Sequence, residues 1–287
     1  MKNLNYEEIK SIFNKKIFEN SKQDLIVKLA EYPQRYISIF RPTKPYTKLI
    51  QNITQSHEIR FGDAFEILIE NIFIKNGYKL LEKNIKKDDK KKSIDQLFEK
   101  NNQIIFIEQK IRDDHDSSKK VGQISNFEDK IYLLIDKYPN KNIKAYFYFI
   151  DPTFKKNKNF YLNEIKNLSK AYNINVYLAY GNELFKYENI DGWCFIIKFL
   201  VKWKKELPNF PEINFDKNPK ESFEEIKNLP PKYFRKLLTN KRIVKEIFPI
   251  LFPEKKTLNL LREYFKTKNK SIFEYLYEEI GRLLWMY

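Results

Sequence analysis

The sequence of 287 residues contains little glycine or cysteine, and each shortage excludes a class of protein. Its 6 glycines form neither a Walker loop nor a dinucleotide fingerprint, in which glycine lets the backbone approach a phosphate. The Gly-X-Ser-X-Gly elbow of α/β-hydrolases does not occur either. A single cysteine, Cys194, rules out an internal disulfide and a zinc finger and fits a reducing compartment. Its apolar neighbours predict a buried structural thiol.

Long hydrophobic runs are also missing. The most apolar region, residues 193–203, is interrupted by Lys198 and Lys202 and is too short to cross a bilayer. The N-terminus mixes acidic and basic residues and shows no targeting segment. From these features we expect a soluble, cytoplasmic protein.

Positive charge, by contrast, is abundant. The net charge of +16 favours a polyanionic partner, and nucleic acid is the usual one. An AT-rich genome would also enrich lysine, asparagine, isoleucine, tyrosine and phenylalanine, so the charge by itself is weak support. A hydrophobic content of 42% excludes general disorder, and the length allows a substantial core.

The most informative segment consists of two neighbouring apolar runs that carry acidic residues and a lysine. Asp95 precedes the first run, and the second run, 104–107, is followed by Glu108 and Lys110. Side chains two apart leave a strand on the same face. A buried strand should not end in a carboxylate and an ammonium group unless they meet each other, a metal or a ligand.

A hairpin between the two runs would place Asp95 beside Glu108, with Asn101 and Asn102 as the turn. Two adjacent carboxylates can hold Mg²⁺, which prefers oxygen ligands. A neighbouring lysine can orient or deprotonate a water and offset negative charge on a phosphate. This combination favours metal-dependent phosphodiester hydrolysis, whereas the alternative is a surface hairpin whose charged residues are solvated.

Asp95, a gap of twelve residues, and then Glu108-Gln109-Lys110 resemble the PD-(D/E)XK nuclease superfamily, in particular its type II restriction endonucleases. The sequence departs from the family name because Ile94, not proline, precedes Asp95. The resemblance implies that Asp95, Glu108 and the carbonyl of Gln109 bind Mg²⁺ while Lys110 positions or activates the attacking water. It also implies 5′-phosphate ends, a homodimer acting on double-stranded DNA, and a DNA methyltransferase encoded nearby.

The resemblance covers roughly residues 57–180. It implies a first core helix that opens at Gly62 and runs to Tyr78, and this helix would supply another catalytic carboxylate. Glu66 is the position we expect for it, with Glu70 as the alternative. Downstream, a helix starting at 122–123 and a third core strand at 144–150 complete the pattern.

Residues 112–123 follow the expected catalytic strand and are polar. Contacts to DNA phosphates or bases are expected from this segment, and the candidates are Arg112, Ser117, Lys119, Lys120 and Gln123. Its three aspartates and His115 allow two other interpretations. They could form a second metal site, or Asp116 or Ser117 could cap the next helix.

The lysines at 86–87 and 90–92 flank Asp88 and Asp89 just before Asp95. They fit a solvated turn or, alternatively, a clamp on DNA phosphates.

The chain as a whole is expected to be α/β, with a mixed central sheet flanked by helices in a restriction-endonuclease-like core. The expected regions are a helical N-terminal extension at 1–56, the catalytic core at 57–205, and a helical C-terminal region at 206–287 that reads DNA or dimerises.

Several single elements are expected within these regions. Residues 54–58 are expected to cap a helix, 163–171 to be helical, 175–180 to be a strand, and 193–203 to be a helix or a last strand. Prolines between 207 and 231 indicate a linker or an irregular wrap.

The sequence therefore predicts a Mg²⁺-dependent type II restriction endonuclease. Two other functions stay open, namely a structure-directed repair or mobile-element nuclease and a catalytically inactive DNA-binding protein. A plain structural protein is a further alternative, which the charged end of the 104–107 run disfavours.

Overall fold

The computed structural model describes residues 5–87 and 90–286, and its contacts divide them into two compact units. Unit 1 comprises 5–13 and 61–207, and unit 2 comprises 14–60 and 208–286. The functional division into 1–56, 57–205 and 206–287 stays a prediction.

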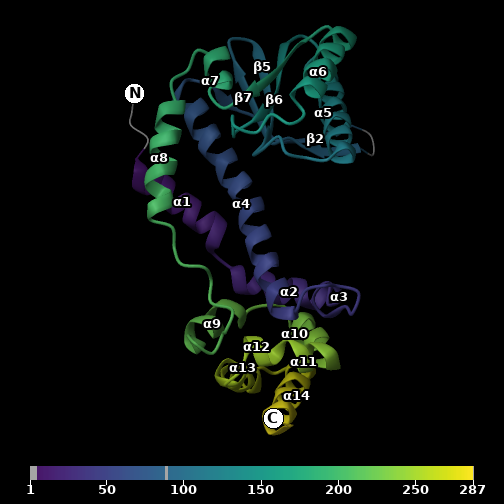
Figure 1. Cartoon of the computed structure of the whole chain (residues 1–287), viewed down its shortest axis with the longest axis vertical. Coiled ribbons are helices and arrows are strands. Elements are labelled where there is room, and N and C mark those ends of the chain that lie inside the picture. Colours follow the sequence, from purple (N-terminus) through teal and green to yellow (C-terminus); the bar gives the residue numbers. More distant parts are fainter. Residues whose placement is uncertain (1–4, 88–89, 287) are drawn as a thin grey trace. The chain divides into compact units, whose positions relative to one another are not determined.

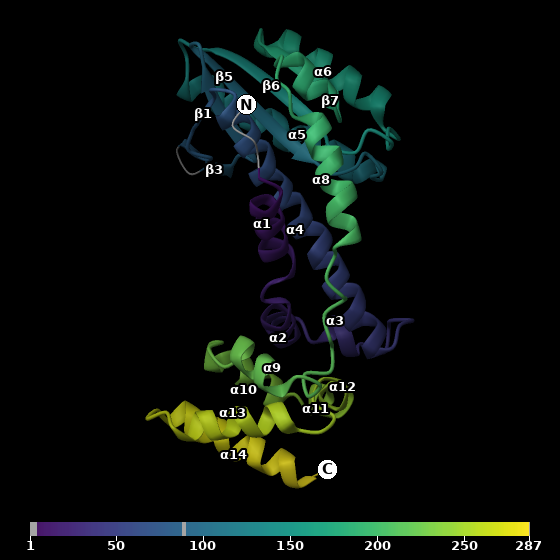
Figure 2. The same cartoon turned by 90° about the vertical axis from the view of Figure 1, so that its left-hand side faces the viewer.

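Unit 1 is built on a mixed sheet of five strands, shown in Figures 1 and 2. In sheet order they are β1 (Lys79–Leu80), β4 (Gln96–Lys100), β5 (Gln103–Lys110), β6 (Asn142–Phe149) and β7 (Asn175–Tyr180). β1, β4 and β5 pair antiparallel, and β5, β6 and β7 pair parallel. The α/β fold with a mixed central sheet expected from the sequence is confirmed.

Two helices make the crossover connections that parallel strands require. They are α5 (Ser117–Lys137), between β5 and β6, and α6 (Lys158–Tyr172), between β6 and β7. Their apolar faces cover one face of the sheet: Phe127 of α5 contacts Phe106 at 5.1 Å between ring centroids, and Tyr161 of α6 stacks on Phe147 at 4.9 Å. β5 is therefore buried along nearly its whole length.

The other elements of unit 1 surround this core. They are α7 (Glu183–Tyr187), α8 (Trp193–Lys205) and the hairpin of β2 (Asn84–Lys87) and β3 (Lys90–Ser93). Two helices contribute residues to both units, α1 (Tyr6–Phe18) and α4 (Pro45–Lys75). Phe73 of α4 stacks on Phe98 of β4 at 4.7 Å, so this helix covers the second face of the sheet.

Unit 2 is helical. Besides its parts of α1 and α4, it contains α2 (Ser21–Glu31), α3 (Gln34–Ile37), α9 (Pro219–Ile226), α10 (Pro231–Thr239), α11 (Lys241–Glu246), α12 (Phe248–Leu251), α13 (Lys256–Lys266) and α14 (Ser271–Met286). They enclose one apolar core, in which Leu25 and Leu29 of α2 lie with Leu261 and Leu276. In the part of the chain described, no helix is both long and apolar enough to cross a bilayer.

The start of α4 differs from the expectation. The expected cap at 54–58 lies inside a helix that begins at Pro45. Thr54 and Ser56 donate their hydroxyls to the carbonyls of Ile50 and Asn52, four residues earlier, so they bond back along the helix and cap nothing.

Three smaller expectations are also settled. α5 begins at Ser117, before the expected 122–123, because Asp116 caps it by accepting the N–H of Lys119 at 2.9 Å. The segment at 193–203 lies within a helix, not a strand. Cys194 is exposed, and the expectation of a buried thiol was wrong because the amphipathic α8 turns this position toward solvent.

Candidate active site

The hairpin of β4 and β5 brings Asp95 to Glu108, as expected. The pairing runs from Gln96 opposite Ile107 to Lys100 opposite Gln103. Asp95, directly before β4, accepts the backbone N–H of Gln109 at 2.9 Å through its Oδ2. The aspartate is thereby fixed against the strand that carries the glutamate and the lysine.

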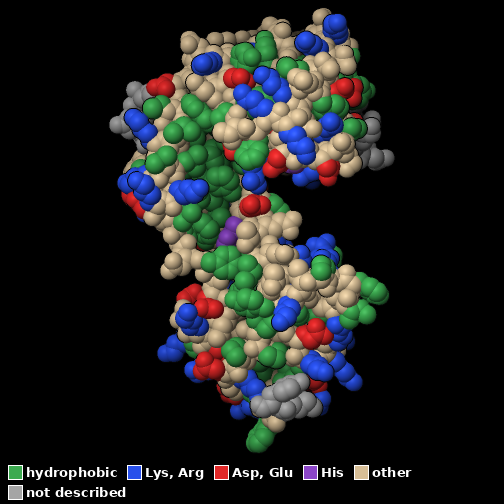
Figure 3. All heavy atoms as spheres, in the orientation of Figure 1, with side chains coloured by type: hydrophobic (Ala, Val, Ile, Leu, Met, Phe, Trp, Pro, Cys, Tyr) green, Lys and Arg blue, Asp and Glu red, His purple; other side chains and the backbone are tan. Residues whose placement is uncertain are grey.

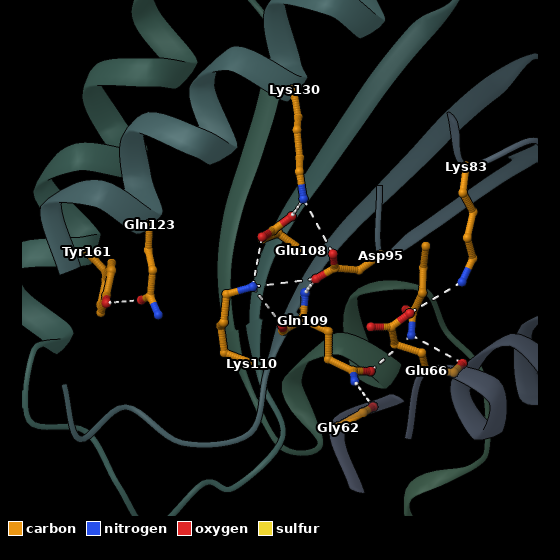
Figure 4. Close-up of polar contacts among 11 residues, drawn as sticks. Gly62, Glu66, Lys83, Asp95, Glu108, Gln109, Lys110, Gln123, Lys130 and Tyr161 are labelled. Atoms are coloured by element: carbon orange, nitrogen blue, oxygen red, sulfur yellow. Dashed lines mark hydrogen bonds and ion pairs between the residues drawn. The ribbon is translucent and has the colours of Figure 1, made fainter. Parts of the chain in front are cut away.

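Three oxygen atoms converge on the ammonium nitrogen of Lys110. Glu108 Oε1 lies 2.8 Å from it, the carbonyl oxygen of Gln109 3.0 Å, and Asp95 Oδ2 3.5 Å (Figure 4). These are the three groups predicted to bind Mg²⁺. Since a cationic group already lies among them, the donor set fits a hard cation.

The electrostatics follow from burial. Glu108 is only 2% exposed, so its carboxylate requires positive partners. Burial alone would lower the pKa of Lys110, but the carboxylates of Glu108 and Asp95 outweigh it, and the pKa is raised. Lys110 is therefore an ammonium group at neutral pH in this arrangement.

A second lysine, which the sequence reasoning missed, completes the cluster. Lys130 of α5 is 4% exposed, and its Nζ lies 2.5 Å from Glu108 Oε2 and 3.4 Å from Asp95 Oδ1 (Figure 4). The available signal was a lysine at helical spacing among apolar residues, three after Phe127 and four before Leu134, on the face of α5 that turns toward the sheet.

The side chain of Gln109 lies on the opposite side of β5 and is held there by two hydrogen bonds. It donates to the carbonyl of Gly62 in α4 at 3.1 Å and accepts from Gln96 at 2.9 Å. Anchoring this side chain fixes the backbone whose carbonyl takes part in the site.

Glu66 comes from α4, as expected, and lies beside the cluster (Figure 4). Burial and then the charge of Asp95 raise its pKa to about 7, although Lys83 at 3.4 Å partly compensates. Lys83 also pairs closely with Glu70. The charge of Asp95 thus acts on the pKa of Glu66, the position expected for the further carboxylate.

The residues predicted to contact DNA occupy the start of α5 and the loop before it. Ser117 and Lys119 are exposed, and Arg112 pairs with Asp114 at 3.7 Å. Lys120 lies over the ring of Phe160 at 4.6 Å. Gln123 accepts the hydroxyl of Tyr161 at 2.8 Å, so its side-chain oxygen is directed toward α6. Their contact with DNA stays a prediction.

The side chain of Asp113 is buried and holds neighbouring segments together through hydrogen bonds. It is fully buried and accepts hydrogen bonds from the backbone and side-chain N–H groups of Asn157, at 3.0 and 2.9 Å, and from the hydroxyl of Tyr180 at 2.9 Å. Within residues 5–87 and 90–286, no group of three or more His, Cys, Asp or Glu side chains is arranged to hold a metal. Geometry thus favours a structural role for Asp113 and the capping role for Asp116.

The lysine runs before Asp95 form the strands β2 and β3. Lys92 is engaged by α5, pairing with Asp129 at 2.9 Å and Asn126 at 3.0 Å, so this lysine is held against the protein. Asp88 and Asp89 lie outside the described residues.

The structure has an aspartate ahead of a hairpin, Glu-X-Lys at the end of the next strand, and a crossover helix after each of β5 and β6. This is the arrangement expected from the resemblance to PD-(D/E)XK nucleases. Residues 74–203 match the family model described as HinfI, a type II restriction endonuclease. The resemblance expected from the sequence is confirmed, and this part of the chain has the fold and motif of a restriction nuclease.

No curated protein matches the chain. Among solved structures, the chain is similar to Can2 from Sulfobacillus thermosulfidooxidans in complex with cyclic tetra-adenylate, at 17% identity and a TM-score of 0.32. The match covers 70% of this chain and 57% of Can2, so the chain spans little more than half of that protein.

Proposed function

We propose that the protein is a Mg²⁺-dependent type II restriction endonuclease that hydrolyses double-stranded DNA at a short specific sequence and leaves 5′-phosphate ends. One observation carries the proposal, namely the convergence of Asp95, Glu108 and the carbonyl of Gln109 on Lys110 Nζ. The match of residues 74–203 to a restriction endonuclease family supports it independently.

Asp95, Glu108 and the Gln109 carbonyl would hold the metal. When bound there, Mg²⁺ would lower the pKa of a coordinated water and offset negative charge on the phosphate. In this role, the hydrogen bond from the Gln109 N–H to Asp95 keeps the carboxylate oriented toward the site.

Lys110 would act as a cation and hydrogen-bond donor. An ammonium group has three donors and no lone pair, so in this state Lys110 can donate hydrogen bonds to a water or to a phosphate oxygen. It would orient the attacking water and stabilise charge on the scissile phosphate. Glu66, whose pKa is raised to about 7, would be an outer group that holds a water near Asp95.

The substrate is inferred from charge. A net charge of +16 favours a polyanion, and Arg112, Ser117, Lys119, Lys120 and Gln123 are the proposed DNA contacts next to the site. A homodimer would cut both strands of a palindrome, because each subunit carries one active site. A methyltransferase encoded nearby would protect the host DNA.

The test is incubation of the purified protein with unmethylated phage DNA, with Mg²⁺ or with EDTA. Lys110→Ala is the test variant, and Lys141→Ala is the control, because Lys141 pairs with Glu99 at the other end of the hairpin, 2.8 Å away. Discrete bands that need Mg²⁺, persist in Lys141→Ala and vanish in Lys110→Ala would support the proposal.

Other outcomes are equally informative. A Mg²⁺-dependent smear would indicate structure-directed cleavage and not sequence-specific cleavage. DNA binding without any cleavage would identify a catalytically inactive binding protein and overturn the proposal. Direct labelling of the fragments by polynucleotide kinase, without prior phosphatase treatment, would contradict 5′-phosphate ends.

A further inference from the structure

Unit 2 carries an apolar projection that its own core does not use. In the loop at 38–44, between α3 and α4, Phe40 is 90% exposed and the adjacent Ile39 78%. Large apolar side chains gain from burial, so two exposed neighbours favour a contact made outside the chain.

The loop is anchored on both sides. Tyr36 and Ile37 before it and Leu49 after it lie in the core of unit 2, and the guanidinium group of Arg242 donates a hydrogen bond to the carbonyl of Ile37. Pro42 and Pro45 restrict the backbone between these anchors. Phe40 therefore projects, 90% exposed, from a loop that is supported at both ends.

The segment that carries this projection has charge of one sign. Residues 32–57 contain no aspartate or glutamate but four basic residues, Arg35, Arg41, Lys44 and Lys48. Arg41 and Lys44 are exposed within or at the end of the loop. In Figure 3, hydrophobic side chains project at the right-hand edge of unit 2, where Figure 1 draws the segment between α3 and α4, and basic side chains lie close by.

We infer that the 38–44 loop is a wedge that inserts into the base stack of duplex DNA, with Phe40 and Ile39 between base pairs and Arg41 and Lys44 on the flanking phosphates. The inference deepens the proposed function and rests on it for the choice of DNA. An apolar side chain flanked by cations is the chemistry that unstacks and kinks a duplex. A phenylalanine ring can also stack on any base, so the contact needs no particular sequence.

A second copy of the chain is the other conceivable partner for an apolar tip. The charges disfavour it, because apposing two such loops would bring together two sets of basic residues without an acidic residue in the segment to pair with them. DNA instead supplies phosphates, whose charge is opposite to that of the basic residues, and base pairs that can accept an apolar side chain.

The experiment measures binding to a short duplex in EDTA by fluorescence anisotropy, so that no cleavage is required. The duplex carries 2-aminopurine, which brightens when it is unstacked. The test variants are Ile39→Ala with Phe40→Ala, and separately Phe40→Trp, which keeps an aromatic ring. Trp285→Ala is the matched control, because Trp285 is also an aromatic residue of unit 2 and is 89% exposed.

We expect the double alanine variant to bind about tenfold more weakly and to lose the 2-aminopurine signal, while Phe40→Trp and Trp285→Ala bind like the wild type. The salt dependence should be unchanged in the double variant and shallower in Arg41→Ala with Lys44→Ala, since only the latter pair would neutralise phosphates.

Equal affinity of the double alanine variant and the wild type would overturn the wedge. The wedge would also be overturned if the double alanine variant sedimented as a monomer where the wild type is a dimer and the 2-aminopurine signal did not change. That result would make the loop a self-association surface. Phe40-dependent unstacking by a wild type that cleaves nothing would support the wedge while the proposed function fails.

Discussion

The ammonium nitrogen of Lys130 lies 2.5 Å from a carboxylate oxygen of Glu108, although the two residues are 22 positions apart and belong to different elements. Both side chains are almost fully buried. A buried ion pair adds little to stability compared with apolar residues, but removing one partner leaves an uncompensated charge. Lys130 is therefore best understood as the closest ion-pair partner of Glu108 inside the core.

Lys130→Met should destabilise unit 1 by about 3–5 kcal/mol, because Glu108 would lose its closest cation. Urea unfolding, followed by circular dichroism, measures the change. Lys137→Met, on the same helix at an exposed position, is the control and should change the free energy of unfolding little. Equal stability of the two variants would show that Lys130 does not compensate Glu108.

Mg²⁺ should raise the melting temperature of the wild type and not that of Asp95→Asn. A cation that binds only the folded state stabilises it by mass action, and Asp95→Asn removes one of the two charged ligands. Differential scanning fluorimetry with and without Mg²⁺ gives a readout that does not depend on cleavage. A similar rise in both proteins would place the bound metal elsewhere.

Asp113→Ala should lower the free energy of unfolding by at least about 2 kcal/mol, because the N–H groups of Asn157 and the hydroxyl of Tyr180 would lose a charged acceptor. Asp114→Ala, at the exposed neighbouring position, should have little effect. The melting temperature of Asp113→Ala should still respond to Mg²⁺. Loss of that response with unchanged stability would instead indicate a metal site at Asp113.

Unit 2 should lose stability in mild acid partly through His57. Burial lowers its pKa, with Ser21 Oγ 3.1 Å from its Nε2 and the ring of Phe18 5.1 Å away. The unfolded chain then takes up the proton first, so the contribution is present above about pH 6.5 and is lost as the pH falls toward the folded-state pKa. Melting temperatures of the wild type and His57→Gln at several pH values test this. The variant should lose less between neutral and mildly acidic pH, and parallel curves would contradict the assignment.

The sequence predicted the parts of the site that depend on local pattern. Glu108 and Lys110 share a face because strand geometry requires it, and the bounds of the strand at 175–180 were predicted correctly because an apolar run stands between turn residues. Asp95 was placed correctly since only a short turn separates its strand from β5.

What the sequence did not predict depends on packing between distant segments. Lys130 enters the site only because α5 packs on β5, and a lysine on a mostly apolar face gives no hint of its partner. The start of α4 was missed because the serine and threonine residues at 54–56, typical of caps, bond back along the helix instead. That α2 shares a core with α10 and α13, which come some two hundred residues later, is likewise a tertiary relationship.

Asn101 and Asn102 both have positive φ, 49° and 63°, as the two-residue turn of a tight hairpin requires. They lie at the far end of β5 from Lys110, yet they set which residue of β4 faces which residue of β5. A slip of one position would turn the side chains of β4 to the opposite face and move Asp95 away from the backbone N–H of Gln109, whereas β5 is also held by its pairing with β6. The placement of Asp95 beside Glu108 and Lys110 thus depends on a turn of two uncharged residues.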